Sequence, residues 1–356
     1  MAENKNLFKS VQKFNSELTP DCAKFCPIKG FESYLVIAYY ELRDQKVYGR
    51  LELYQVEQNK LVIKDIVESA GVLDFQWFYQ KIDNTVFLST ACSDSFVRIY
   101  SLKEQKEESN IKLHKEREIQ TEEGHKCLYI DVNITLPQIR IVTSTDQESV
   151  FIIDLAQNLE PLKEITKVSK HQFSVWACGI SKEDQNIFLS GGDDQKLILY
   201  DTRVPDFQVM MNKRSHEMGI CTINFDPLNS NQFFTGCYDE HLRLWDVRNI
   251  QKEIFASKRE GGVWRAIWKP QSSTQALLGV YCQHYFEIVD LNGNSKINEI
   301  QNHIFYDSLL KETVEQQEKL EGHTSLAYSC DWSQDTKNII TCSFYDKIVQ
   351  LWSLTE

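Results

Sequence analysis

The chain has 356 residues, of which 42% are hydrophobic, and its 51 acidic against 39 basic residues give a formal net charge of −12. This composition is typical of a globular protein, and an acidic balance without a block of Lys and Arg argues against a general nucleic-acid binder, because affinity for phosphate backbones comes from clustered basic residues. The sequence has no uncharged apolar run of about 18 residues and no apolar stretch at its start. This argues against a membrane span or a signal peptide and favours a cytoplasmic protein.

Seven segments alternate apolar and polar residues with the period of two that is typical of β-strands. In chain order they are GRLELYQ from Gly49, DSFVRIYS from Asp94, ESVFIID from Glu148, DQKLILYD from Asp194, DEHLRLWD from Asp239, HYFEIVD from His284 and DKIVQLW from Asp346. Measured between the aromatic or apolar ends of these strands, the spacing is 44 to 53 residues, with 63 before the last, which accommodates four short strands and their turns; the ends are Tyr54, Tyr100, Ile153, Tyr200, Trp245, Val289 and Trp352. That is the size of a propeller blade, so the sequence predicts an all-β, seven-bladed propeller.

The blades are expected within a single domain, 1–356, near residues 28–58, 70–105, 125–165, 171–212, 216–256, 262–302 and 323–356. Residues 103–118 form a charged stretch that predicts a solvated loop, and residues 307–320 predict an exposed helix inserted before the last blade. The last blade ends after its third strand. We therefore expect a strand from within residues 4–28 to supply the fourth and to close the ring.

Three blades share one further pattern, in which a His is followed 23 residues later by an Asp and 29 residues later by an aromatic residue. The three sets are His171, Asp194 and Tyr200; His216, Asp239 and Trp245; and His323, Asp346 and Trp352. With the dipeptides Gly124-His125, Gly322-His323 and Trp245-Asp246, the pattern resembles the WD-repeat family. In that family the Asp accepts hydrogen bonds from the His of the preceding loop, so we expect these histidines to stabilise the blades.

No metal or cofactor site is predicted. Cys22 and Cys26 form a CxxxC pair without a second pair, and no cluster of His and Cys has the spacing of zinc ligands. The motifs of nucleophile-elbow esterases and of nucleotide-binding loops are absent from the sequence.

Six stretches resemble a narrower family, the diphthine methyl ester hydrolases, which are WD-repeat proteins of diphthamide biosynthesis. They are GGDDQKLILYDTR (191–203), HEMGICTI (216–223), CYDEHLRLWDVRN (237–249), GGVWRAIWKP (261–270), HTSLAYSCDW (323–332) and TCSFYDKIVQLW (341–352). The resemblance implies hydrolysis of the methyl ester on a modified histidine of translation elongation factor 2. The sequence indicates no cofactor and nothing in it suggests an obligate oligomer, so we expect a monomer. The alternative is a non-catalytic propeller that holds protein partners, because fold alone does not decide function.

The implied substrate carries a trimethylammonium group, which aromatic faces and acidic side chains can hold. Candidates for this role lie in loops that should meet at one mouth of the propeller: Tyr238, Trp264, Tyr328 and Tyr345, with negative charge from Glu240 and Asp331. The same aromatic residues could equally pack between blades.

Ester hydrolysis also needs a base or nucleophile and a donor for the oxyanion. His241 beside Glu240, or His216, could act as the base, since imidazole titrates near neutral pH. Arg265 or the amides of Gly261 and Gly262 could stabilise the oxyanion, and Ser325 is a nucleophile only if a base lies within reach.

Overall fold

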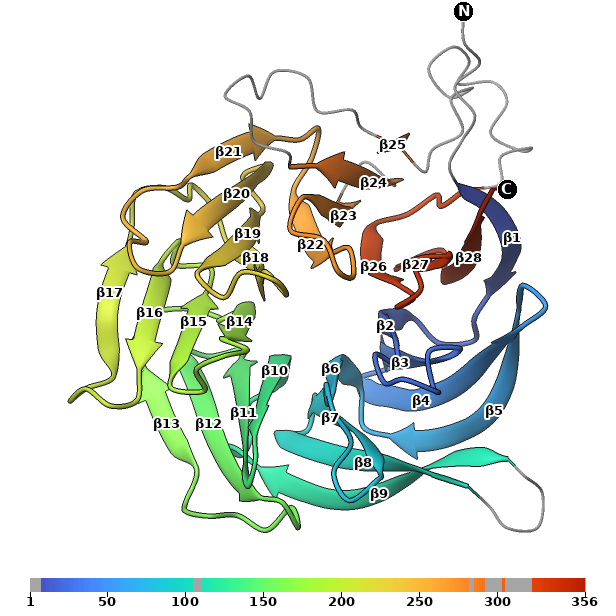
Figure 1. Cartoon of the computed structure of the whole chain (residues 1–356), viewed down its shortest axis with the longest axis horizontal. Coiled ribbons are helices and arrows are strands. Elements are labelled where there is room, and N and C mark those ends of the chain that lie inside the picture. Colours follow the sequence, from blue (N-terminus) through green and yellow to red (C-terminus); the bar gives the residue numbers. More distant parts are fainter. Residues whose placement is uncertain (1–7, 105–109, 282–284, 292–302, 305–321, 356) are drawn as a thin grey trace, which may run out of the picture.

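The computed structural model describes residues 8–104, 110–281, 285–291, 303–304 and 322–355. Seven four-stranded antiparallel sheets surround a central channel, in chain order around the ring (Figure 1). The predicted all-β, seven-bladed propeller is thus confirmed. None of the described segments is a helix of the length and apolarity that a membrane crossing requires.

Each sheet runs from its innermost to its outermost strand. The first three blades contain β2 (Pro20–Phe25), β3 (Tyr34–Arg43), β4 (Lys46–Glu57) and β5 (Lys60–Ser69); β6 (Val72–Trp77), β7 (Val86–Cys92), β8 (Phe96–Glu104) and β9 (Ile111–Gln120); and β10 (Cys127–Thr135), β11 (Gln138–Thr145), β12 (Ser149–Ala156) and β13 (Thr166–Ser169). The next two contain β14 (Ala177–Ile180), β15 (Ile187–Gly191), β16 (Leu197–Asp201) and β17 (Gln208–Asn212); and β18 (Ile220–Phe225), β19 (Gln232–Cys237), β20 (His241–Asp246) and β21 (Phe255–Lys258). The last two contain β22 (Val263–Trp268), β23 (Gln275–Val280), β24 (Tyr285–Asp290) and β25 (His303–Ile304); and β26 (Ala327–Trp332), β27 (Asn338–Ser343), β28 (Ile348–Leu354) and β1 (Phe8–Asn15).

The N-terminal strand closes the ring as expected. β1 pairs with β28 in antiparallel register from Phe8 opposite Leu354 to Asn15 opposite Ile348. The first blade starts earlier than the range near 28–58 would place it, because residues 20–25 form its innermost strand instead of belonging to a connecting segment. The N-terminal region thus contributes to two blades.

Within the charged stretch 103–118, residues 103–104 belong to β8 and residues 111–118 to β9, so the prediction of a loop was wrong for them, while residues 105–109 lie outside the described residues. β9 pairs with β8 over its whole length, and the apolar side chains of Leu113 and Ile119 are buried. β9 is the outermost strand of its blade, so its many charged residues can face solvent while two apolar positions anchor it. The helix expected over residues 307–320 lies outside the described residues.

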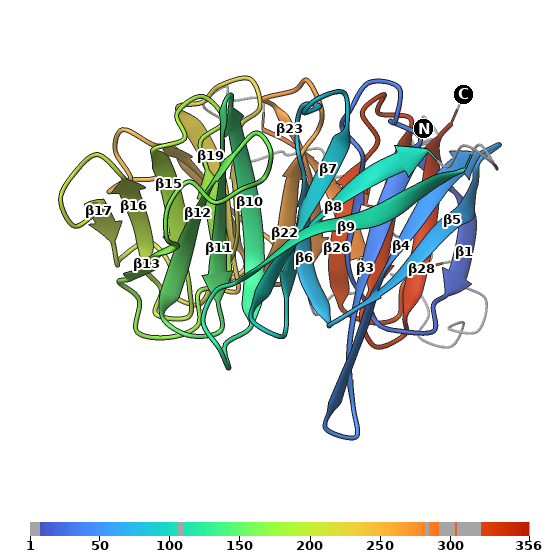
Figure 2. The ribbon, with the colours of Figure 1, turned by 90° about the horizontal axis from the view of Figure 1, so that it is seen from below.

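The two faces of the propeller are distinguished by the hairpin of β3 and β4, whose turn projects well beyond the other turns (Figure 2). We call this side the hairpin face and the other the opposite face. Because the strands of each blade alternate in direction, every innermost strand starts at the hairpin face, and every turn between second and third strands returns to it.

The innermost strands line the channel in three layers. In six of them the register shifts after the first residue, which takes the second residue out of the ordinary alternation. The side chains at this second position face the channel near the hairpin face: Asp21, Leu73, Leu128, Cys221, Trp264 and Tyr328. Trp176, the residue before β14, lines the same space. The third and fifth positions follow deeper, since strand side chains repeat with a period of two.

Candidate active site at the hairpin face

The second-position side chains surround a cavity of about 20 Å³, which Tyr129 and Arg265 close from below. A space of this size holds about one water molecule. The cavity is therefore not a preformed site for a whole ligand, but it can hold a water beneath a ligand seated on the mouth.

Aromatic rings cover this cavity on the side of blades four to seven. The centroid of the Trp264 ring lies 5.0 Å from that of Tyr328, 5.2 Å from Tyr281 and 5.8 Å from Trp176. The group extends to further rings, and we call the whole set the aromatic cluster: Trp176, Tyr238, Trp264, Tyr281, Tyr328, Phe344 and Tyr345. All four aromatic residues expected at the mouth belong to it, and Tyr345, 75% exposed, forms its outer edge.

Asp21 is the acidic group of the cavity. Its side chain is 2% exposed, and its Oδ1 atom has no hydrogen-bond partner among the described residues. Burial raises the pKa of this carboxyl group well above its usual value and nearby Asp74 raises it further, while the positive charge of Arg265 lowers it. Asp21 thus faces a space the size of a water molecule with an unused acceptor.

Asp21 and Trp176 were not among the residues predicted for the site. Asp21 lies in the N-terminal segment, far along the chain from every motif of the resemblance, and Trp176 precedes a strand without a distinctive motif. For Asp21, the sequence signal was an acidic residue between Pro20 and the apolar residues of β2.

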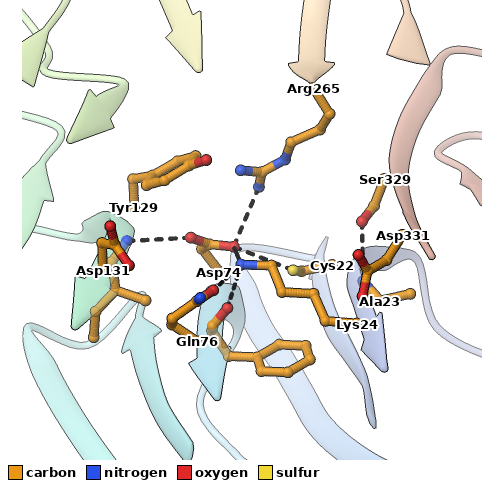
Figure 3. Close-up of polar contacts among 12 residues, drawn as sticks. Cys22, Ala23, Lys24, Asp74, Gln76, Tyr129, Asp131, Arg265, Ser329 and Asp331 are labelled. Atoms are coloured by element: carbon orange, nitrogen blue, oxygen red, sulfur yellow. Dashed lines mark hydrogen bonds and ion pairs between the residues drawn. The ribbon is translucent and has the colours of Figure 1, made fainter. Parts of the chain in front are cut away.

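Arg265 forms the floor of the cavity together with Tyr129 (Figure 3). Its guanidinium carbon lies 4.8 Å from the centroid of the Tyr129 ring, and its Nη2 atom lies 3.6 Å from Oδ1 of Asp74. The Nε atom is buried and has no hydrogen-bond partner among the described residues. Because the guanidinium group is permanently charged, it supplies a fixed positive charge at this depth of the channel.

Asp74, the third residue of β6, lies in the same layer as Tyr129 and Arg265 and links the first three blades. Its carboxylate accepts hydrogen bonds from Lys24 Nζ at 3.0 Å, from the thiol of Cys22 at 3.1 Å and from the backbone amide of Ile130 at 3.1 Å. We call Lys24, Asp74, Tyr129 and Arg265 the buried network. It separates the hairpin-face mouth from the opposite end of the channel.

The expected hydrogen bond from His to Asp forms directly in the fourth blade, where 2.8 Å separates Nδ1 of His171 from Oδ1 of Asp194. In the last blade the link passes through Ser343, which hydrogen-bonds both His323 and Asp346. In the fifth blade Asp239 pairs instead with Arg243. The pattern therefore stabilises the blades, but through three different hydrogen-bond arrangements.

His216 lies within this framework. Its Nε2 atom is 2.9 Å from the hydroxyl of Thr235, its ring stacks on Trp245, and burial lowers its pKa to about 3. A histidine in this environment is neutral at physiological pH and is enclosed by its own blade, which favours the structural role.

His241 and Glu240 lie on the hairpin face but at the edge of the fifth blade. The Nδ1 atom of His241 is 2.8 Å from the backbone oxygen of Asp239, and the carboxylate of Glu240 pairs with Lys258 at 3.2 Å. Ser325 lies near the mouth, where its hydroxyl accepts a hydrogen bond from the backbone amide of Tyr345 at 3.0 Å. None of the three is among the residues that line the cavity.

Asp331 lies at the other end of the channel and not with the aromatic cluster. It is the fifth residue of β26, whereas Tyr328 is the second, and the strand runs along the channel from one face towards the other. Asp331 was expected at the mouth because it is close to Tyr328 in the sequence. In an extended strand, however, three residues span about 10 Å, which separates the two side chains along the channel.

Three stretches of the chain, residues 162–201, 208–246 and 314–353, match the family described as WD domain, G-beta repeat. The chain is 28% identical to a human protein named diphthine methyltransferase, over 91% of this chain and 74% of that protein. A Schizosaccharomyces pombe protein of the same name is 26% identical over 93% of this chain and 94% of its own. Among solved structures, a chain of the mitotic checkpoint complex covers 100% of this chain with a TM-score of 0.69 at 12% identity, which shows the shared fold.

Proposed function

We propose that this protein acts in diphthamide biosynthesis, where it hydrolyses the methyl ester of diphthine on translation elongation factor 2 to diphthine and methanol. The names of its relatives support the choice of substrate. The observation that carries the chemistry is Asp21, a buried carboxyl group with an unused oxygen, facing a water-sized cavity beneath the aromatic cluster.

The aromatic cluster supplies the cation site of this proposal. Quaternary ammonium groups are held against aromatic faces, with about 0.5 to 2 kcal/mol per contact. Trp264 and Tyr328 line the same cavity as Asp21, so a trimethylammonium group seated on these rings gains the attraction of the Asp21 carboxylate. Such a position brings the adjoining ester group over the cavity.

In the proposed reaction a water in the cavity attacks the ester carbonyl, and Asp21 accepts the proton of that water. The guanidinium group of Arg265 stabilises the negative charge that develops on the carbonyl oxygen. Collapse of the tetrahedral intermediate breaks the bond between the acyl carbon and the methoxy oxygen. The leaving oxygen takes up the proton from Asp21 and departs as methanol, so that the net reaction consumes one water.

The raised pKa of Asp21 couples binding to catalysis in this scheme. Burial favours the neutral form of the carboxyl group, and an arriving quaternary cation favours the ionised form that can act as base. Asp21 is preferred to His241 as the base because His241 does not line the cavity and its Nδ1 atom is engaged by Asp239.

The protein part of the substrate has a surface to meet around the mouth. Four exposed apolar side chains lie at the hairpin face, Leu42 near the end of β3 and Phe173, Met218 and Tyr345 on loops or turns, exposed by 60%, 62%, 47% and 75%. Exposed apolar groups around a site are typical of protein contacts. They support recognition of a modified side chain on a folded protein and not of a free small molecule.

The test is the rate of methanol release by variants with matched shape. Asp21→Asn removes the base with little change in volume, and we expect kcat/KM to fall by about 100-fold or more, while the wild-type value rises with pH as Asp21 ionises. Asp335→Asn, a change at an exposed carboxylate remote from the mouth, is the control and should leave the rate unaltered. Full activity of Asp21→Asn would overturn the assignment of the base.

A further inference from the structure

A second, larger cavity opens at the opposite face of the propeller, on the far side of the buried network. Its volume is about 530 Å³, within the range of roughly 300–1,000 Å³ that is usual for small-ligand sites. Fifth-position side chains of the innermost strands line its floor: Lys24, Gln76, Asp131, Asn224, Ile267 and Asp331. The proposed esterase site makes no use of this cavity, which we call the opposite pocket.

Both lysines of the opposite pocket are neutralised by neighbours. Lys24 donates hydrogen bonds to Asp74 and to the side-chain oxygen of Gln76, each at 3.0 Å. Lys182 lies 2.6 Å from Oδ1 of Asp131 and also donates to the backbone oxygen of Val132 at 3.2 Å. These ion pairs leave the floor without a free positive charge to attract an anion.

Asp331 is the charge that remains. Its Oδ2 atom accepts a hydrogen bond from the backbone amide of Phe25 at 2.7 Å, and no basic group of the described residues forms an ion pair with it. Desolvation in the pocket raises the pKa of Asp331 to about 7, because two backbone amides and the distant charge of Lys24 compensate only part of the cost. A cation bound at Asp331 would offset the cost of desolvating its carboxylate.

Part of the wall of the opposite pocket is apolar, beside the polar side chains of its floor. Phe25, Trp77 and Trp268 line the pocket and are almost fully buried, and Leu228, 61% exposed, also belongs to its lining. An acid in a pocket with such an apolar wall suits a ligand with an alkyl chain behind a charged head.

We infer that the opposite pocket binds a primary alkylammonium group, with the ammonium hydrogen-bonded to Asp331 and its alkyl chain against Phe25 and Trp268. Such a group is the end of a lysine side chain on a partner protein, or a free aliphatic amine. A carboxylate acceptor favours a head that can donate hydrogen bonds, whereas a quaternary head can donate none. The inference is independent of the proposed esterase activity, because the buried network lies between the two sites.

Calorimetric titration of the full chain at pH 8 tests the inference with butylamine, butyltrimethylammonium and butan-1-ol as probes. We expect butylamine to bind at least tenfold more tightly than the other two, and Asp331→Asn to lose that preference. Asn at this position keeps the acceptor for the amide of Phe25, and Asp335→Asn serves as the control that retains binding. Equal affinity for butylamine and butan-1-ol, or undiminished binding by Asp331→Asn, would overturn the inference.

A pH titration of the wild-type protein keeps the test independent of the folding of any variant. Affinity for butylamine should fall about tenfold per pH unit below the pKa of Asp331. Among the described residues, Lys24 is the charged group that acts on Asp331, and because its own pKa is raised it keeps its charge over this range. Affinity that is constant from pH 8 to pH 5 would contradict the role of Asp331.

Parallel titrations with Nα-acetyl-lysine methylamide identify the source of the ammonium group. Tighter binding of this probe than of butylamine supports a lysine side chain of a protein partner, and the reverse order supports a free amine.

Discussion

Trp264 lies at the centre of the aromatic cluster, in ring contact with Trp176, Tyr238, Tyr281 and Tyr328. Its position at the mouth follows from one backbone feature, the register shift after Val263 that turns the second residue of β22 towards the channel. A residue that packs only between blades would be shielded from a ligand, whereas Trp264 is partly exposed above the cavity.

Trp264→Ala should therefore weaken binding of the trimethylated substrate more than binding of an uncharged substrate of the same shape. The loss specific to the cation should be about 1 to 2 kcal/mol, the value of a cation–π contact that is partly shielded from water. This loss is measured from the affinities of two peptides, one with the trimethylated side chain and one with the uncharged side chain of the same shape. Equal losses for both ligands would show that Trp264 acts only through packing.

Asp331 gives a residue-scale prediction about stability. Its pKa is about 7 in the folded protein and near 4 in the unfolded chain, so the folded state binds more protons between these values. The unfolding free energy should therefore fall as the pH rises from 4 to 7. Asp331→Asn removes this loss of unfolding free energy. It should therefore raise the melting temperature at pH 8 by about 1 to 4 °C, with no change at pH 4. An equal shift at both pH values would contradict the raised pKa.

At the scale of elements, β1 and β9 show what local sequence can and cannot predict. The need for a strand beside β28 follows from the repeat, because the final blade supplies only three strands from the C-terminal end of the chain. β9 was mistaken for a loop because its exposed face carries many charged residues, and only its pairing with β8 reveals the buried Leu113 and Ile119. Outermost strands are thus the hardest elements to predict from composition.

The closure by β1 is testable through Phe8, which is 6% exposed and has its ring 5.9 Å from that of Trp332. Phe8→Ala should lower the free energy of unfolding by about 3 kcal/mol, since a buried aromatic side chain is lost from the contact between the last two blades. Lys9→Ala, on the exposed side of the same strand, should cost less than about 0.5 kcal/mol. Urea denaturation measures both, and equal small effects would argue against the pairing of β1 with β28.

At the scale of the whole molecule, the repeat predicts the ring but not the contents of its channel. Seven similar segments predict seven blades because each blade is a local unit. The channel is assembled from one strand of every blade, so the meeting of Asp21, Trp176, Trp264 and Arg265 depends on register shifts in strands far apart in the sequence. The motifs therefore predicted aromatic residues of the mouth, whereas the place of Asp21 in the cavity and the position of Asp331 became known only from the structure.

The central claim is that the protein removes a methyl group from diphthine methyl ester by hydrolysis. The most direct measurement is the mass of elongation factor 2 that carries the methylated intermediate, before and after incubation with this protein and without any added cofactor. We predict a loss of about 14 Da, the mass of one methylene, with release of one methanol per modified chain. An unchanged mass in the presence of the folded protein would contradict the claim and favour a non-catalytic scaffold, and a gain of about 14 Da with an added methyl donor would reverse the direction of the reaction.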